Sequence, residues 1–300
     1  MSQLLRQFPW PSLPGSPVPP QWDGRQFLVR GQPQDVLCYE AADSHWSSEL
    51  TEMHEAEAGS THPIDRASRA LAIQSLEHFT AGRGLIVLDV GCSSGFLLEE
   101  IRARRPEAEL IGSDFIAPPL QALARRLPGV PLLQFDLRKC PLPDAAVEAI
   151  TALNVLEHID DDAAALGHIF RVLKPGGITH LEVPAGPHLY DIYDEHLMHH
   201  RRYTLGPLQD MARAAGFEVL KATHLGAWMY PAFAWVKRKN RRLLQLPPEE
   251  KKRIVAGQIH ATSHSVVLRT LLRAELALGR RISYRWGIRC VLVLRKPAGS

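Results

Sequence analysis

The sequence lacks three features that would each have placed the protein in a particular class. Its four cysteines are far apart and form no C-x-x-C pair, so neither a zinc site nor a disulfide framework is expected. The longest uncharged apolar stretch, residues 225–236, has twelve residues and is too short to cross a bilayer. The chain does not open with a basic segment followed by an apolar one, so no signal peptide is expected. Together these absences favour a cytoplasmic protein.

Charge is distributed unevenly along the chain. Residues 237–300 contain 16 Lys and Arg against 3 acidic residues, whereas residues 1–236 contain 19 against 29. A basic C-terminal region attached to an acidic body indicates an anionic partner. A solvated basic face without a partner is the competing interpretation.

The most informative stretch is LIVLDVGCSSG, residues 85–95. An apolar run ends at Asp89, small residues with Gly91 and Gly95 follow, and a helical pattern begins at Phe96, which predicts a buried strand, a tight turn and a helix start. Such a turn lets backbone N–H groups approach a ligand. The pattern is D-x-G-x-x-x-G and not the dinucleotide fingerprint G-x-G-x-x-G. A carboxylate is a poor neighbour for a phosphate and a good one for an ammonium group.

Two more carboxylates stand at the ends of predicted strands, Asp114 and Asp136. Asp114 lies one strand–helix–strand unit after the glycine turn, where an acidic residue accepts hydrogen bonds from ribose hydroxyls, and Phe115 beside it is suited to pack on adenine. The alternative for Asp114 is a helix N-cap, because prolines that suit a helix start follow it. All three carboxylates are expected at the carboxyl edge of one parallel sheet, where open α/β sheets bind ligands.

This order of landmarks resembles the class I S-adenosylmethionine-dependent methyltransferases over about residues 83–224 and the last strand. The resemblance implies an α/β, Rossmann-like fold with seven mostly parallel strands in the order 3-2-1-4-5-7-6 and helices on both faces. It implies S-adenosylmethionine as cofactor and S-adenosylhomocysteine as product. The residues that it assigns to the cofactor are Asp89, Gly91, Cys92, Ser93, Gly95, Asp114, Phe115, Asp136, Leu137, Asn154 and Val155.

The chain divides into five predicted parts. Residues 1–35 are rich in proline and are expected to be an extended tail or a strap over the body. Residues 36–82 should form a helical cover, with helices over 40–57 and 63–79. The methyltransferase core spans 83–224, a basic helical insertion spans 225–287, and the last strand and a tail occupy 288–300.

Candidate catalytic residues follow the fourth and fifth predicted strands. If the acceptor is a hydroxyl, a histidine suits the role of general base, and His158, His199 and His200 are the candidates. Arg201, Arg202 and Tyr203 are assigned to substrate binding. The histidines and acids of residues 186–204 do not follow H-E-x-x-H spacing, so no metal is expected. Some quinone O-methyltransferases, which are broad relatives, have a Glu three residues before the "EH" pair, where this chain has Asn154.

The resemblance therefore predicts methyl transfer, in the first instance to oxygen of a small-molecule or lipid-linked acceptor. Aromatic residues followed by basic ones at the start of the insertion (Trp228, Tyr230, Phe233 and Trp235) suit peripheral contact with an anionic membrane, on its inner face. Packing of these aromatics into the body is the alternative. A nucleic-acid (RNA) methyltransferase is a second function hypothesis, although the N-P-P-Y tetrapeptide of amino-methylating enzymes is absent. A non-catalytic cofactor-binding scaffold is the third.

Overall fold

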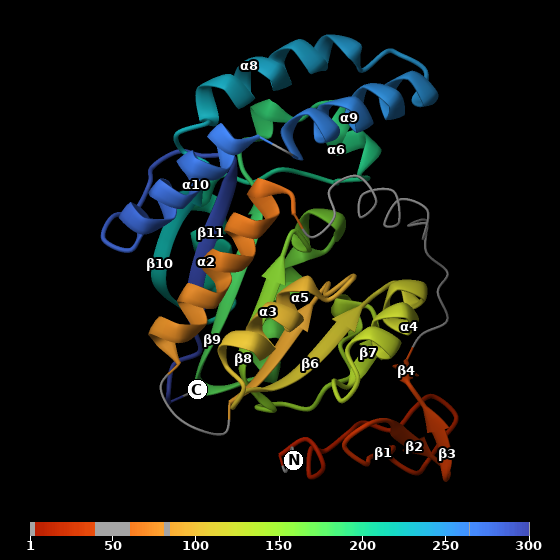
Figure 1. The fold of residues 1–300 in the computed structure, drawn as a ribbon. Helices are drawn as coiled ribbons and strands as arrows, with labels where there is room; N and C mark the ends of the chain where they lie inside the picture. The colour runs from red at the N-terminus through yellow and green to blue at the C-terminus, as the bar shows by residue number, and fades with distance from the viewer. Residues whose placement is uncertain (1–3, 40–60, 81–84, 264, 300) are drawn as a thin grey trace.

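The protein is described here by a computed structural model, which covers residues 4–39, 61–80, 85–263 and 265–299 (Figure 1). Its centre is an eight-stranded sheet in the order β10-β11-β9-β8-β5-β6-β7-β4, in which only β11 runs antiparallel to its neighbours. The strands are β4 (Val36–Cys38), β5 (Ile86–Val90), β6 (Glu109–Asp114), β7 (Leu132–Gln134), β8 (Val147–Leu153), β9 (Leu173–Pro184), β10 (Glu218–Leu225) and β11 (Arg289–Arg295).

The predicted strand order is confirmed, and one strand was missed. From β7 to β10 the sheet has the predicted order 3-2-1-4-5-7-6. The correction is the eighth strand, β4, which pairs in parallel with β7 so that Val36 lies beside Leu132. A three-residue strand shows no alternation that a sequence pattern could reveal, and its Leu37 is buried by the β7 edge.

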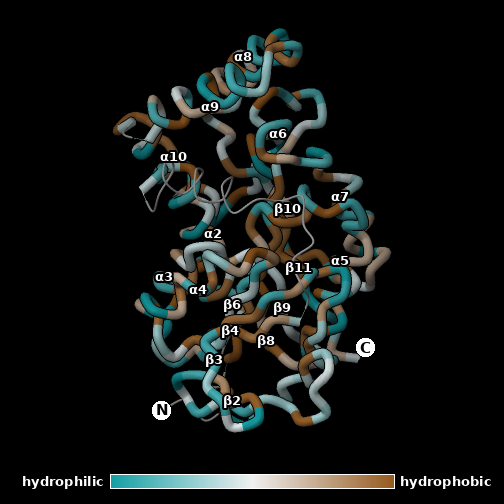
Figure 2. The backbone as a smooth tube through the Cα atoms, turned by 90° about the vertical axis from the view of Figure 1, so that its right-hand side faces the viewer, coloured by the Kyte–Doolittle hydropathy of each residue, from teal (hydrophilic) through white to brown (hydrophobic). Residues whose placement is uncertain are grey.

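Alternating residues of the strands build two hydrophobic layers, one on each face of the sheet. On β5, Ile86 and Leu88 belong to the layer that packs on α5 (Asp162–Val172) and α7 (Leu205–Ala214). Leu85 and Val87 belong to the opposite layer, under α2 (Pro63–Phe79), α3 (Phe96–Arg104) and α4 (Ala117–Arg126). In Figure 2 the hydrophobic segments concentrate in these central strands.

The proline-rich N-terminal segment packs on the body and does not extend away from it. Strands β1 (Gln21–Trp22), β2 (Phe27–Val29) and β3 (Gln32–Gln34) form a small antiparallel sheet. Trp10 and Phe27 are buried in the same layer as α5, and the Tyr39 hydroxyl donates to the Pro11 carbonyl over 2.9 Å. The segment is a strap that completes one face of the core.

The helical cover and the insertion complete the structure. The predicted helix at 63–79 is confirmed as α2, whereas the helix expected at 40–57 falls outside the described residues. The insertion contains α8 (Tyr230–Asn240), α9 (Pro248–Ser263) and α10 (Val266–Gly279), where the sequence suggested one long helical pattern after residue 249. These helices gather at one end of the molecule, together with the short α6 (Ile192–His196), as Figure 1 shows.

Candidate functional site

The glycine turn between β5 and α3 has the left-handed backbone that its sequence predicts. Gly91 and Gly95 have φ angles of 70° and 72°, and Ser93 adopts 46°. A β-carbon on Gly91 would come within 2.6 Å of Val155 Cγ2, and one on Gly95 within 2.5 Å of Leu123 Cδ1. Both positions therefore exclude a side chain by strain and by contact, and they leave bare backbone at the start of α3.

Asp89 ends its strand as a buried carboxyl group. Its Oδ1 accepts a hydrogen bond of 2.7 Å from the Thr151 hydroxyl on the neighbouring strand β8. Burial raises the pKa of Asp89 to about 7, the Thr151 hydrogen bond opposes this shift, and repulsion from Asp114 adds to it. A cationic group placed beside Asp89 would favour its ionised form.

Asp114 ends β6 as predicted, whereas Asp136 lies two residues beyond the end of β7 and caps the 3₁₀ turn η1 (Leu137–Lys139). Asp114 accepts backbone N–H bonds of 2.9 Å from Ser93 and Ile116, so it also clamps the glycine turn. Asp136 is buried, and the Arg138 guanidinium binds both of its oxygens at 2.9 and 3.1 Å. Arg138 in turn reaches Asp160. An adenine bound at Asp136 would therefore share this carboxylate with Arg138. The sequence did not suggest Arg138 as a partner of Asp136.

The loop after β8 brings Val155 against Gly91 and leads to the histidines. Asn154 has a positive φ of 55°, and its N–H donates to the Glu182 carbonyl of β9 over 2.8 Å. The short 3₁₀ turn η2 (Leu156–His158) follows directly. Residues assigned to the methionine side of the cofactor and the candidate base His158 thus belong to one continuous turn.

His199 is oriented by a buried acid. Its Nδ1 lies 2.8 Å from Asp194 Oδ1, and because a carboxylate only accepts, Nδ1 carries the proton and Nε2 has the open lone pair. Burial lowers the pKa of His199, although Asp194 opposes this shift. Burial would raise the pKa of Asp194, but the His199 hydrogen bond and the charges of Lys237 and Arg202 hold it well below its usual value. The pair is a neutral imidazole beside a carboxylate.

Glu157, His158 and His199 come together from two segments of chain. Their nearest possible ligand atoms all lie within 4.8 Å of one another. The rings of His158 and His199 meet edge to face with centroids 4.7 Å apart. Glu157 is completely buried, neither carboxyl oxygen has a hydrogen-bond partner, and burial raises its pKa to about 8. This set could hold a divalent cation, an arrangement that the sequence argument did not assemble.

The remaining predicted residues have unequal access. His200 is exposed, and its N–H donates to the Glu157 carbonyl over 2.8 Å. Arg201 bonds Asp162. Arg202 and Tyr203, assigned to substrate, are buried, with the arginine on Asp194 and the tyrosine hydroxyl donating to the Leu156 carbonyl or to Asp162. Both side chains therefore use their hydrogen-bond donors on groups of the protein itself. In this structure they support the loop and do not line a surface that a substrate could contact.

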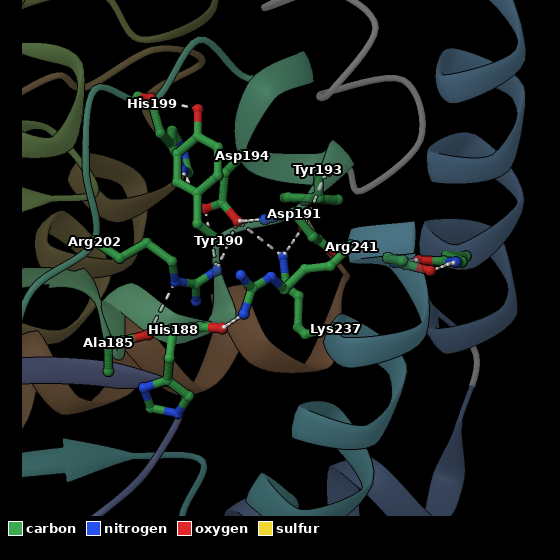
Figure 3. A network of polar contacts seen from close by, with 12 residues as sticks. Ala185, His188, Tyr190, Asp191, Tyr193, Asp194, His199, Arg202, Lys237 and Arg241 are labelled. Carbon is green, nitrogen blue, oxygen red and sulfur yellow. Dashed lines mark hydrogen bonds and ion pairs between the residues drawn. The ribbon is translucent and has the colours of Figure 1, made fainter. Parts of the chain in front are cut away.

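A network of buried ion pairs joins the insertion to the segment 186–204, which carries His199 and is called the histidine loop below (Figure 3). Lys237 of α8 lies 2.6 Å from Asp191 Oδ1 and 3.3 Å from Asp194 Oδ2, and all three side chains are buried. Asp191 and Asp194 also cap α6 reciprocally. Arg202 bonds Asp194 at 3.0 Å and donates to the Ala185 carbonyl. The carboxylate that orients His199 is therefore supported from the insertion, 43 residues away in sequence.

Several of these partners escaped the sequence argument. Thr151 lies in an ordinary strand, and Lys237 was grouped with a basic cluster. Asp194 belongs to the segment whose metal pattern was rejected. The D-x-x-D spacing of Asp191 and Asp194 was a usable signal, because it is a capping box. Nothing in the sequence alone indicated which cation would meet it.

Comparisons with known proteins agree on the core. Residues 88–181 match a family model described as a methyltransferase domain. A protein of Mycolicibacterium smegmatis that bears the name of an S-adenosylmethionine-dependent methyltransferase is 34% identical over 49% of this chain and 56% of its own length. The demethylmenaquinone methyltransferase of Thermus thermophilus is 38% identical over 34% of this chain and 48% of its own. The chain thus spans about half the length of these relatives.

The fold of the chain is also similar to that of a solved methyltransferase structure. The phosphoethanolamine N-methyltransferase 2 of Haemonchus contortus, solved in complex with S-adenosylmethionine, is similar with a TM-score of 0.53. That likeness covers 85% of this chain and 58% of the other, at 14% identity. At this identity the likeness shows the fold alone.

Proposed function

We propose that the chain is a class I S-adenosylmethionine-dependent methyltransferase that transfers the methyl group to an oxygen of a small-molecule or lipid-linked acceptor. When bound, the cofactor supplies an electrophilic methyl carbon on a sulfonium centre. Displacement at such a carbon depends chiefly on the alignment of donor and acceptor. The chain's task is accordingly to hold the cofactor, orient the acceptor and receive a proton.

The residues around the glycine turn fit the cofactor. Asp89 offers a buried carboxyl group to the ammonium of the amino-acid moiety, and Asp114 offers a carboxylate at the neighbouring strand end to the ribose hydroxyls. Gly91 and Gly95 keep the intervening backbone bare. A dinucleotide fits less well, because Asp89 would face its phosphates.

The observation that carries the choice of oxygen is the Asp194–His199 hydrogen bond of 2.8 Å. It fixes the tautomer in which Nε2 accepts. When an acceptor hydroxyl takes the methyl group that the bound cofactor would supply, Nε2 of His199 would receive the proton of that hydroxyl. Asp194 stabilises the imidazolium that results. The match to a demethylmenaquinone methyltransferase supports a lipid-soluble acceptor.

The test supplies radiolabelled methyl donor and the purified protein to lipid and small-molecule extracts of the source organism. We expect one labelled product, with transfer by His199→Asn reduced about 10²–10⁴-fold while cofactor affinity is retained. His260→Asn, an exposed histidine of α9, serves as the matched control. Label in RNA only, or on nitrogen of the product, would contradict the proposal.

A cation-assisted version of the same transfer is the second candidate. It is favoured by the two unpartnered oxygens of Glu157 beside His158 and His199. A divalent cation there would bind the acceptor oxygen and lower its pKa, without a protein base. Chelation separates the two candidates: transfer that survives extensive treatment with EDTA supports His199 as the base, whereas loss of activity that added Mg²⁺ or Zn²⁺ restores supports the cation.

A further inference from the structure

Exposed large hydrophobic side chains are concentrated in the insertion. Of the eleven such side chains in the described residues, eight lie between residues 228 and 286. Isolated exposed hydrophobics are normal on a soluble protein, but a concentration of them marks an interaction surface. The eight are Trp228, Trp235, Val266, Val267, Leu271, Leu278, Ile282 and Trp286.

Helix α10 exposes one apolar stripe while burying another. Leu268 and Leu272 face the core, where they pack in one cluster with Leu71 of α2. Val267, Leu271 and Leu278 are spaced by four and seven residues, so they share one side of the helix. Their exposed fractions are 70%, 37% and 42%. The outer side of α10 is thus apolar along its length, with no described part of the chain covering it.

The charges around this stripe all have one sign. Arg269, Arg273, Arg280, Arg281 and Arg285 are exposed, on α10 and the turn that follows it. The single acidic residue between 266 and 286, Glu275, is 1% exposed and accepts N–H bonds from Gly226, Ala227 and Trp228. The Glu275 carboxylate is thus bound to backbone N–H groups just before α8 and does not face the outer side of α10. The exposed part of α10 therefore carries the apolar stripe along one edge and Arg269, Arg273 and Arg280 along the other, without a compensating carboxylate.

From this combination we propose that the outer face of α10, with the turn to Trp286, docks on the surface of an anionic lipid bilayer. An interfacial helix uses an apolar stripe for the acyl boundary and flanking cations for the headgroups. A nucleic acid would use the arginines and leave the leucines in water. A second copy of the chain would set arginine against arginine. Among the residues that the structure describes, none of the helices combines the length and the hydropathy of a membrane span.

Two sets of contacts connect α10 with the residues beside His199. Glu275 of α10 caps the segment that begins α8, and Lys237 of α8 binds the carboxylates beside His199. In Figure 1, α8, α9 and α10 gather at the end of the molecule that also holds α6. Docking through α10 therefore places the lipid surface at the end of the molecule that carries α6.

The test is sedimentation of the full chain with vesicles. Vesicles of phosphatidylcholine alone are compared with vesicles that contain phosphatidylglycerol, at low and high salt. We expect binding to the anionic vesicles only, weakened by salt, and reduced at least about tenfold by the double variant L271E/L278E. V18E is the matched control, because Val18 is also an exposed aliphatic residue, 53% accessible, on the N-terminal strap.

Cofactor binding and melting temperature are measured on the same samples, so that a folding defect is recognised. Because the docking face lies outside the cofactor site, L271E/L278E should bind cofactor like the parent even if the proposed acceptor chemistry is wrong. R273Q/R280Q, which keeps the apolar stripe, should weaken anionic-vesicle binding without affecting the fold. Unchanged vesicle binding by both double variants, binding to RNA but not to vesicles, or a concentration-dependent dimer broken by L271E/L278E would each overturn the proposal.

Discussion

Lys237 and Asp191, 46 residues apart in sequence, form a buried ion pair of 2.6 Å between the insertion and the loop that carries His199. Asp194, the second carboxylate on this lysine, is also the group that orients the imidazole. The insertion is therefore part of the support of the site and not an independent appendage. An ion pair of this kind costs more when one partner is lost than it contributes when intact.

Replacing Lys237 should accordingly destabilise the protein and loosen the site. Lys237→Met leaves Asp191 and Asp194 buried with one cation fewer, and we expect a loss of about 3 kcal/mol in the free energy of unfolding. Denaturant unfolding measures it. Lys239→Met, an exposed position on the same helix, is the control and should lie near the parent. If the two variants unfold alike, the buried pair is not formed.

Asp191→Asn should restore part of the stability that Lys237→Met removes, because it deletes one of the unmatched charges.

The glycine turn should not tolerate a side chain at Gly95. Gly95→Ala forces a side chain into a left-handed backbone, with a β-carbon 2.5 Å from Leu123. We expect a loss of about 1–3 kcal/mol in stability and a clear loss of cofactor affinity, because the turn must shift. Gly206→Ala is the matched change, since nothing lies within 4 Å of its added β-carbon. Equal behaviour of the two variants in calorimetry with cofactor would remove the turn from the binding site.

Asp89 predicts how cofactor binding depends on pH. Its pKa of about 7 in the free protein means that it is largely protonated below neutrality. A cationic ligand binds the ionised form, so affinity should rise between about pH 6 and pH 8. Asp89→Asn keeps an oxygen for the Thr151 hydroxyl but has no charge to gain, and its affinity should be weaker and nearly independent of pH. A parallel pH dependence in both proteins would assign the effect to another group.

The raised pKa of Asp89 also leads us to expect that the stability of the cofactor-free protein depends on pH. Because the folded pKa of Asp89 is above its unfolded value, the stability that its proton confers is complete below about pH 4 and is lost as pH rises through 7. Asp89→Asn lacks this loss. Thermal melts should therefore show the variant gaining on the parent from pH 5 to pH 8, by about 2 kcal/mol. A constant difference across this range would show that Asp89 does not hold a proton in the folded state.

Most of the core was predictable from the sequence because local signals there agree with the tertiary structure. The apolar run ending at Asp89, the glycines after it, and the repeated strand–helix spacing to Asp114 and Asp136 locate the sheet and its carboxyl edge. The strand order then followed from the family resemblance. Helix α2 was predictable from its proline start and apolar spacing.

What could not be predicted depends on contacts between distant segments. Strand β4 exists only because β7 offers it an edge, and the strap folds because Trp10 and Phe27 find the core. Arg202 looked like a substrate cation in the sequence, but burial beside Asp194 gives it a partner inside the protein. The gathering of Glu157 with His199 likewise required the chain to return across forty residues, a distance at which spacing carries no information.

Calorimetry of the purified chain with S-adenosylhomocysteine tests the proposal that Asp89 and the turn up to Gly95 bind S-adenosylmethionine. We expect one-to-one binding near pH 7.5, severely weakened in Asp89→Asn and Gly95→Ala and retained in Gly206→Ala. Absence of heat with the parent protein, or equal affinity in all four proteins, would contradict it.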